Sequence, residues 1–155
     1  MTSHAPLQTL TDGDGSIAVG WLGEGTLYTR FMAGLSASLG TAYAAHLQSL
    51  LNQSQKVRYF ADITRLKQYD LLARSAFVRV VLANRARLCS MAVHARPDAQ
   101  GLASRTFTAS LGGWVELVGE PREFESQLVR AAPMARERID PRTWTPPGGT
   151  LRPAR

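Results

Sequence analysis

The sequence predicts one α/β domain, with a mostly parallel sheet, an antiparallel hairpin at one edge and helices packed against the sheet. Three observations lead to this class. The 155 residues are close to the usual size of one domain. The composition, 45% apolar and 19% charged, is that of an ordinary globular protein. The apolar residues switch between a period of two and a period of 3.6, which predicts the element order β-β-α-β-α-β-α-β-α.

The first predicted elements are a hairpin and a helix. Two short β-rich runs, residues 16–22 and 26–32, flank a Gly-Glu-Gly turn in which glycine supplies unusual backbone angles. Apolar residues at helical spacing then predict a helix, with Ser38 as its cap and an end near Asn52. These apolar residues are Leu39, Tyr43, Leu47 and Leu50.

A third strand, a loop and a second helix come next. Residues 56–63 alternate between apolar and polar side chains, which predicts a strand. Residues 64–69 are predicted as a loop to Asp70, whose carboxylate can accept from the free N–H groups that begin a helix. Two apolar stripes on that helix, residues 71–87, predict that it is covered on more than one side. The apolar run 88–93 predicts a strand buried on both faces.

A helix, a strand and a further helix complete the folded part. Asp98 is the expected cap of the third helix, which ends at a Gly-Gly pair. Residues 114–118 are the last predicted strand. Pro121 then takes the first position of a fourth helix, in which Phe124 and Leu128 pack one turn apart.

Both ends of the chain are predicted to be flexible appendages of a domain that spans residues 16–132. Segment 1–15 contains a polar, turn-forming run of Asp and Gly. Segment 133–155 is rich in Pro and Arg and holds five of the eight prolines. It also contributes +3 of the net charge of +6, from five Arg against one Glu and one Asp.

The cysteine content and the absence of a targeting segment predict a cytoplasmic protein. The single cysteine, Cys89, excludes an intramolecular disulfide and is expected to be a small buried hydrophobic residue. The first residues lack the basic and apolar regions of a signal peptide. The longest uncharged stretch, residues 31–55, holds too many polar side chains for a membrane span, so we expect no membrane association.

Segment 62–74 has the sequence DITRLKQYDLLAR, in which a strand ends at Asp62 and a second aspartate, Asp70, begins a helix. This pattern, with Leu66 between the aspartates and the predicted order of elements, resembles the STAS domain family, the fold of bacterial anti-sigma-factor antagonists. The Tyr69-Asp70 pair before Arg74 is similar to a divergent branch of short bacterial STAS-like proteins. The resemblance covers residues 16–131 and implies a partner-binding surface where the loop meets the helix.

The chain departs from the phosphoregulated members of that family at one place. In those members a Ser that a kinase partner modifies follows the Asp that begins this helix. The matching positions are Leu71 and Leu72, which have no hydroxyl, so a phosphorylation switch cannot operate there. Control would have to come from partner abundance, another modification or a ligand.

Candidate catalytic and metal-binding residues are sparse. Asp62 and Asp70 could be a pair of acid and base carboxylates, but their positions favour a strand end and a helix cap. His46 and His94 have no Cys, Asp or second His nearby at metal-ligand spacing. The glycine-rich turn leads into a strand, whereas a phosphate loop must begin a helix, and no Gly-x-Ser-x-Gly elbow occurs. We therefore expect no enzyme activity, no metal and no cofactor.

These observations predict a non-enzymatic protein-protein interaction or regulatory module of the bacterial cytoplasm. Its partner, for example a kinase-like or sensor regulator, would contact the loop and helix start through five residues. These are Asp62, Thr64, Tyr69, Asp70 and Arg74. Purely local roles for Tyr69, Asp70 and Arg74 stay open, and strand edges leave room for a homodimer.

Two other functions also stay open. The sheet and helices could enclose an apolar small molecule or lipid, which requires a closed cavity of roughly a few hundred Å³. The basic tail with Trp144 could bind nucleic acid weakly, although its arginines are not interleaved with several aromatic residues.

Overall fold

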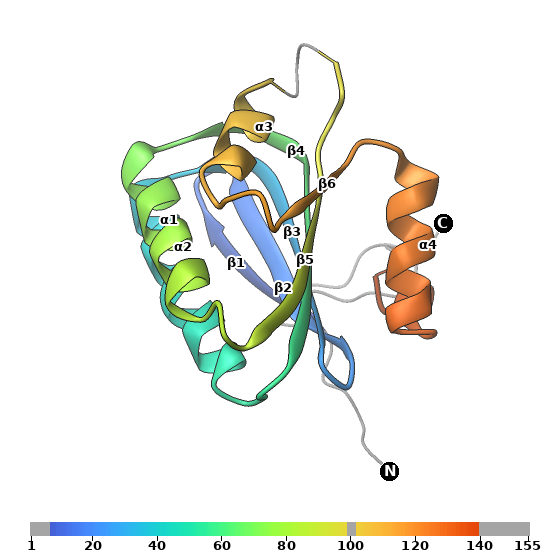
Figure 1. The fold of residues 1–155 in the computed structure, drawn as a ribbon. Coiled ribbons are helices and arrows are strands. Elements are labelled where there is room, and N and C mark those ends of the chain that lie inside the picture. Colours follow the sequence, from blue (N-terminus) through green and yellow to red (C-terminus); the bar gives the residue numbers. More distant parts are fainter. Residues whose placement is uncertain (1–6, 99–101, 140–155) are drawn as a thin grey trace, which may run out of the picture.

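A six-stranded sheet forms the centre of the computed structural model, which describes residues 7–98 and 102–139 (Figure 1). The strands lie in sequence order: β1 (Gln8–Asp12), β2 (Gly15–Gly23), β3 (Thr26–Leu35), β4 (Val57–Tyr69), β5 (Leu88–His94) and β6 (Glu116–Val118). The pairs β1-β2 and β2-β3 are antiparallel, and the three pairs from β3 to β6 are parallel. The predicted α/β class, a mostly parallel sheet with an antiparallel edge, is confirmed.

Helices cover both faces of this sheet (Figure 1). One face carries α1 (Ala37–Leu51), α2 (Leu71–Ala83) and α3 (Leu102–Ala109), because each crossover between parallel strands has the same hand and moves one strand further along. The other face carries α4 (Pro121–Ala131) and the short α5 (Ala135–Ile139). As predicted, Pro121 is the first residue of α4, and Phe124 and Leu128 are buried.

The core therefore has two parts, one on each face of the sheet. The larger part lies under α1 and α2, where the rings of Phe31, Tyr43 and Phe77 contact one another. The smaller part lies under α4, where Phe60 of β4 meets Phe124 at a ring distance of 5.9 Å. Successive side chains of a strand point to opposite faces, so the alternation along β4 supplies both parts.

The prediction that residues 1–15 form a flexible appendage is wrong for the second half of this segment. Residues 8–12 form β1, which pairs with β2 from Gln8↔Val19 to Asp12↔Gly15, and Leu7 is buried. The Asp and Gly run is the two-residue turn of this hairpin, and Gly13 adopts a φ of 62° there. Turn residues that seemed to end the domain thus join two of its strands.

The C-terminal appendage predicted from residue 133 also begins too early. Residues 135–139 form α5, in which Ala135 is fully buried. The Arg138 guanidinium donates to the Trp21 carbonyl of β2 at 3.1 Å, which ties α5 to the sheet. Residues 140–155, including Trp144, lie outside the described residues.

Three predicted boundaries differ from the structure, the first because strand pairing extends further than the alternation of side chains. Residues 64–69 are not a loop but the second half of β4, which pairs with β3 as far as Leu35↔Tyr69. The cap of α1 is Ser36 and not Ser38, since its side chain accepts from the Leu39 N–H. β6 begins at Glu116, two residues later than predicted.

Three predictions about burial and capping are also wrong. Cys89 is exposed, because the first part of β5 is open on one side and only its end is buried on both faces. Helix α2 buries a single stripe and leaves Leu71 and Leu82 exposed, and it ends at Ala83. Helix α3 begins at Leu102, so Asp98 lies several residues before it and accepts from Arg96 at 2.8 Å.

No helix among residues 7–98 and 102–139 combines the length and apolar character needed to cross a membrane.

Candidate functional site

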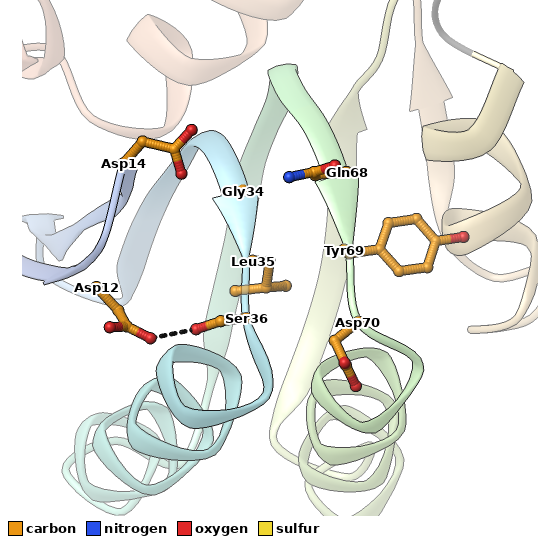
Figure 2. A pocket seen from close by; sticks show the side chains of 8 residues that line it. All are labelled: Asp12, Asp14, Gly34, Leu35, Ser36, Gln68, Tyr69 and Asp70. Atoms are coloured by element: carbon orange, nitrogen blue, oxygen red, sulfur yellow. Dashed lines mark hydrogen bonds between the residues drawn. The ribbon is translucent and has the colours of Figure 1, made fainter.

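A polar cleft of about 310 Å³ lies where α1 and α2 begin (Figure 2). Its walls come from the β1-β2 turn, the end of β3 and the end of β4. The lining residues are Asp12, Asp14, Gly34, Leu35, Ser36, Gln68, Tyr69 and Asp70. Gln68 points toward Gly34 across the cleft, whereas the Tyr69 ring points away from it (Figure 2). The cleft therefore presents the carboxylates of three aspartates together with the amide nitrogen of Gln68.

Parallel pairing and close helix packing bring these residues together. Strands β3 and β4 end side by side, and the Asp70 N–H donates to the Leu35 carbonyl at 2.8 Å. The two following helices cross at Gly40 of α1 and Ala73 of α2, where a Cβ on Gly40 would lie only 2.3 Å from that of Ala73. Because Gly40 has no side chain, the first turns of both helices can lie next to each other.

Each helix start has a side-chain cap. Asp70 caps α2 as predicted, with its carboxylate accepting from the Leu72 N–H at 2.8 Å. Ser36 caps α1, accepting from the Leu39 N–H at 3.1 Å. Asp12 accepts from the Ser36 and Ser38 hydroxyls at 2.5 and 2.6 Å, and these bonds lower the pKa of Asp12 below its ordinary value of 3.8. Both rims of the cleft are thus built from hydrogen-bonded aspartates.

The five predicted partner-binding residues fall into two groups. Tyr69, Asp70 and Arg74 lie together at the start of α2, where the Asp70 carbonyl accepts from the Arg74 N–H at 3.0 Å. Asp62 and Thr64 lie further back on β4, on the same face as Phe60 and α4. The structure therefore does not unite the five residues in one surface.

Asp62 and Thr64 interact mainly with each other. One oxygen of Asp62 accepts from the Thr64 N–H at 3.0 Å and from the Thr64 hydroxyl at 2.7 Å. The same oxygen lies 3.7 Å from Nδ1 of His94, whose ring stacks on Phe124 of α4. This pattern agrees with a structural interpretation of Asp62.

The most exposed apolar side chains at this site are Leu71 and Leu72. They are 68% and 69% exposed and directly follow the Asp70 cap. With Tyr69, Asp70 and Arg74 they form what we call the α2-start surface. In the sequence both leucines stand out only as replacements for a phosphorylatable residue. Their exposure could have been predicted from the buried stripe Ala73, Phe77 and Val81, which leaves the first two positions of α2 on its outer side.

The described residues offer no metal cluster, and the apolar gap under α2 is small. Within the ranges 7–98 and 102–139, no group of three or more His, Cys, Asp or Glu could hold a metal ion. The apolar gap between α2 and β4, lined by Phe77 and Ile63, has a volume of about 10 Å³. That is room for about one water molecule, so this gap does not support the predicted alternative of an enclosed lipid or apolar ligand.

Comparison with known proteins identifies the fold. No model of a protein family matches the chain, and no curated protein matches it in sequence. One similar structure is a crystal structure from Shewanella loihica PV-4, of an uncharacterized DUF3478-family protein with a SpoIIAA-like fold. The match covers 83% of this chain and 97% of the Shewanella chain. Its TM-score is 0.53 and its sequence identity 16%. A second structure, the anti-sigma factor antagonist SpoIIAA in its unphosphorylated form, covers 80% of this chain and 97% of its own, with a TM-score of 0.49 and 14% identity. The chain therefore has a SpoIIAA-like fold of the STAS type, as its sequence resemblance predicts.

Proposed function

We propose that this chain is a non-enzymatic regulatory module of the bacterial cytoplasm that binds a protein partner through the α2-start surface. The observation that supports this proposal most strongly is the exposure of Leu71 and Leu72 beside the polar cleft. Burying an exposed leucine fully against a partner contributes about 1.5–3 kcal/mol. Two adjacent leucines with a tyrosine and an arginine around them give the apolar centre and polar rim of a typical protein interface.

The charge of the cleft suggests the chemistry of the partner. Asp12, Asp14 and Asp70 place three carboxylates at its rim. A partner segment with apolar side chains next to a Lys or Arg would complement this surface in both shape and charge. Asp62 and Thr64, which face α4, have no part in this interface.

Regulation at this surface cannot use the usual phosphorylation. A phosphate would add roughly two negative charges at the start of α2, but Leu71 and Leu72 have no hydroxyl to accept it. We infer that the interface is permanently apolar and that binding is controlled by partner abundance, by a modification elsewhere or by a ligand.

The experiment that tests this proposal compares two ends of the same helix. The Leu71→Ser/Leu72→Ser variant removes the exposed leucines at the start of α2, and Leu82→Ser removes the leucine that is 48% exposed near its end. Affinity capture from the source cells, quantified by mass spectrometry, is expected to show one protein retained by the wild type and by Leu82→Ser. The same protein is expected to fall at least about tenfold with the double variant.

Equal capture by all three chains would contradict the proposed surface. A second comparison separates the two groups of predicted residues, since Asp62→Asn/Thr64→Ala is expected to leave capture unchanged. Loss of the partner with that variant alone would place the interface on the α4 face.

A further inference from the structure

A second, larger hollow of about 650 Å³ lies on the face of the sheet that carries α4. Its floor comes from three neighbouring strands, where Ser16 of β2 pairs with Met32 of β3 and Met32 pairs with Arg65 of β4. The remaining lining residues are Asp14, Ala33, Thr64, Leu66, Lys67 and Arg96. We call this region the basic hollow because three of its residues are cations and one is an acid.

Two of these cations have no ionic partner. Arg65 and Lys67 are exposed, lie two residues apart on β4 and line the same hollow. Within the part of the chain that the structure describes, no carboxylate lies within ion-pair distance of either side chain. Arg96 differs from them, because it donates to Asp98 at 2.8 Å. The hollow thus holds two positive charges that an anion could neutralise.

The backbone around the basic hollow is irregular in a way that is common at ligand sites. The register between β3 and β4 shifts twice, between Arg30 and Met32 and again between Ala33 and Gly34. Between the two shifts, Ala33 adopts a φ of 65°, and it is the only residue other than glycine with a positive φ among those described. An alanine in this conformation costs free energy, and both such strain and β-bulges concentrate next to binding sites.

We propose that the basic hollow binds a small organic oxyanion, a phosphate or carboxylate group, through Arg65 and Lys67. Its volume of about 650 Å³ lies within the range of small-molecule sites, roughly 300–1,000 Å³. The guanidinium of Arg65 can hold either group with two parallel hydrogen bonds, and Lys67 adds a compact positive charge. Met32 and Ala33 supply apolar surface for the carbon part of the ligand.

The geometry favours a small ligand over a macromolecule. At the hollow, Met32 of β3 is paired on both sides, with Ser16 of β2 and Arg65 of β4, so a peptide cannot add to β3 there as a further strand. Beyond Asp62, β4 pairs with β3 alone. Two unpaired cations are also far fewer than the roughly 6–10 phosphate contacts of a typical duplex-binding protein.

The test uses the full-length chain and three probes: inorganic phosphate, pyrophosphate and citrate. Amide chemical shifts are followed by NMR in the wild type, in Arg65→Gln/Lys67→Gln and in the control Lys56→Gln/Arg58→Gln. The control removes two exposed cations with the same spacing from the other end of β4. At least one probe is expected to shift residues 32, 33, 65 and 67 saturably in the wild type and the control. Its dissociation constant is expected to rise at least about tenfold in Arg65→Gln/Lys67→Gln.

The probes also separate the two sources of the oxyanion, since preference for citrate would indicate a carboxylate ligand and preference for pyrophosphate a phosphate ligand. The proposal is wrong if no probe saturates, or if both double variants weaken binding equally. Saturable binding of a DNA duplex or of polyglutamate without any response to the three small anions would also overturn it.

Discussion

At the scale of single residues, the buried hydroxyls of Thr29, Tyr43 and Tyr59 join α1 to the sheet. The Tyr43 hydroxyl lies 2.6 Å from the Thr29 hydroxyl and 2.5 Å from that of Tyr59, and the Tyr59 hydroxyl donates to Thr29 at 3.3 Å. Burial raises the pKa of both phenols, that of Tyr59 to about 12, so both remain protonated and able to donate at neutral pH. Each of the three hydroxyls can therefore donate to one neighbour and accept from another.

We expect that removing one hydroxyl of this triangle lowers the free energy of unfolding more, per hydroxyl, than removing all three together. Tyr43→Phe leaves Thr29 and Tyr59 with fewer partners inside the core, so it should lower the free energy of unfolding by about 1–3 kcal/mol. The triple variant Thr29→Val/Tyr43→Phe/Tyr59→Phe removes every hydroxyl, and its loss should be smaller than the sum of the three single losses. Urea unfolding of the four variants tests this, and strictly additive losses would contradict the cooperative triangle.

The ionisation of Asp12 makes the stability of the folded chain depend on pH. Its folded pKa is lowered from 3.8 by hydrogen bonds from Ser36 and then Ser38. Because the carboxyl pKa of Asp12 is lower in the folded chain than in the unfolded chain, ionised Asp12 stabilises the fold in full at pH values above 3.8. This contribution is lost as the pH falls from 3.8 through the folded pKa, since the unfolded chain becomes protonated at a higher pH than the folded chain. A carbon-detected NMR titration should give a midpoint for Asp12 below 3.8, and Ser38→Ala should raise it. A midpoint at or above 3.8 would show that the two hydroxyls do not stabilise the charge.

At the scale of elements, the contact between Gly40 and Ala73 sets the spacing of α1 and α2. A Cβ on Gly40 would lie 2.3 Å from the Ala73 Cβ and 2.6 Å from its Cα, so the helices would have to move apart. Overpacking of this kind costs about 1–3 kcal/mol, which exceeds the gain of about 1 kcal/mol for alanine over glycine in an open helix. Gly40→Ala should therefore destabilise the fold in urea unfolding.

Two further variants make this prediction specific. Gly113→Ala should change stability by less than about 0.5 kcal/mol, because no heavy atom lies within 4 Å of its added Cβ. Ala73→Gly in the Gly40→Ala background should recover only part of the loss, since it removes the clashing methyl but leaves the Cα of residue 73 at 2.6 Å from the added Cβ. A Gly40→Ala variant that is as stable as the wild type would mean that the crossing point is not tight.

Some ends of helices and strands could be predicted from the sequence and others could not. Asp70 and Pro121 were identified as helix starts because a cap or a proline acts on its own first turn. The second half of β4 was missed because its register shifts opposite β3 break the regular alternation of side chains. The cap of α1 was misplaced by two residues, since Ser36 and Ser38 are both near the start and only the backbone path selects Ser36.

At the scale of the whole molecule, the order of elements predicted the α/β class and its STAS-type fold, but not the site. The parallel crossovers follow from alternating strands and helices, which is a property of the sequence pattern. The polar cleft instead depends on the contact of the β1-β2 turn with the start of α1, between residues such as Asp12 and Ser36 that are far apart in sequence. The same holds for the basic hollow, whose lining comes from the β1-β2 turn, three strands and the segment after β5.

The central claim, that a protein partner binds at the start of α2, is tested most directly by site-specific photo-crosslinking in the source cells. A benzophenone side chain at position 72 occupies the exposed side of the first turn, and one at position 82 is the matched probe near the other end of the same helix. The proposed function predicts a covalent adduct with one defined protein from position 72 and none from position 82. An adduct from position 82 alone, or no adduct from either position in cells that produce the folded chain, would contradict it.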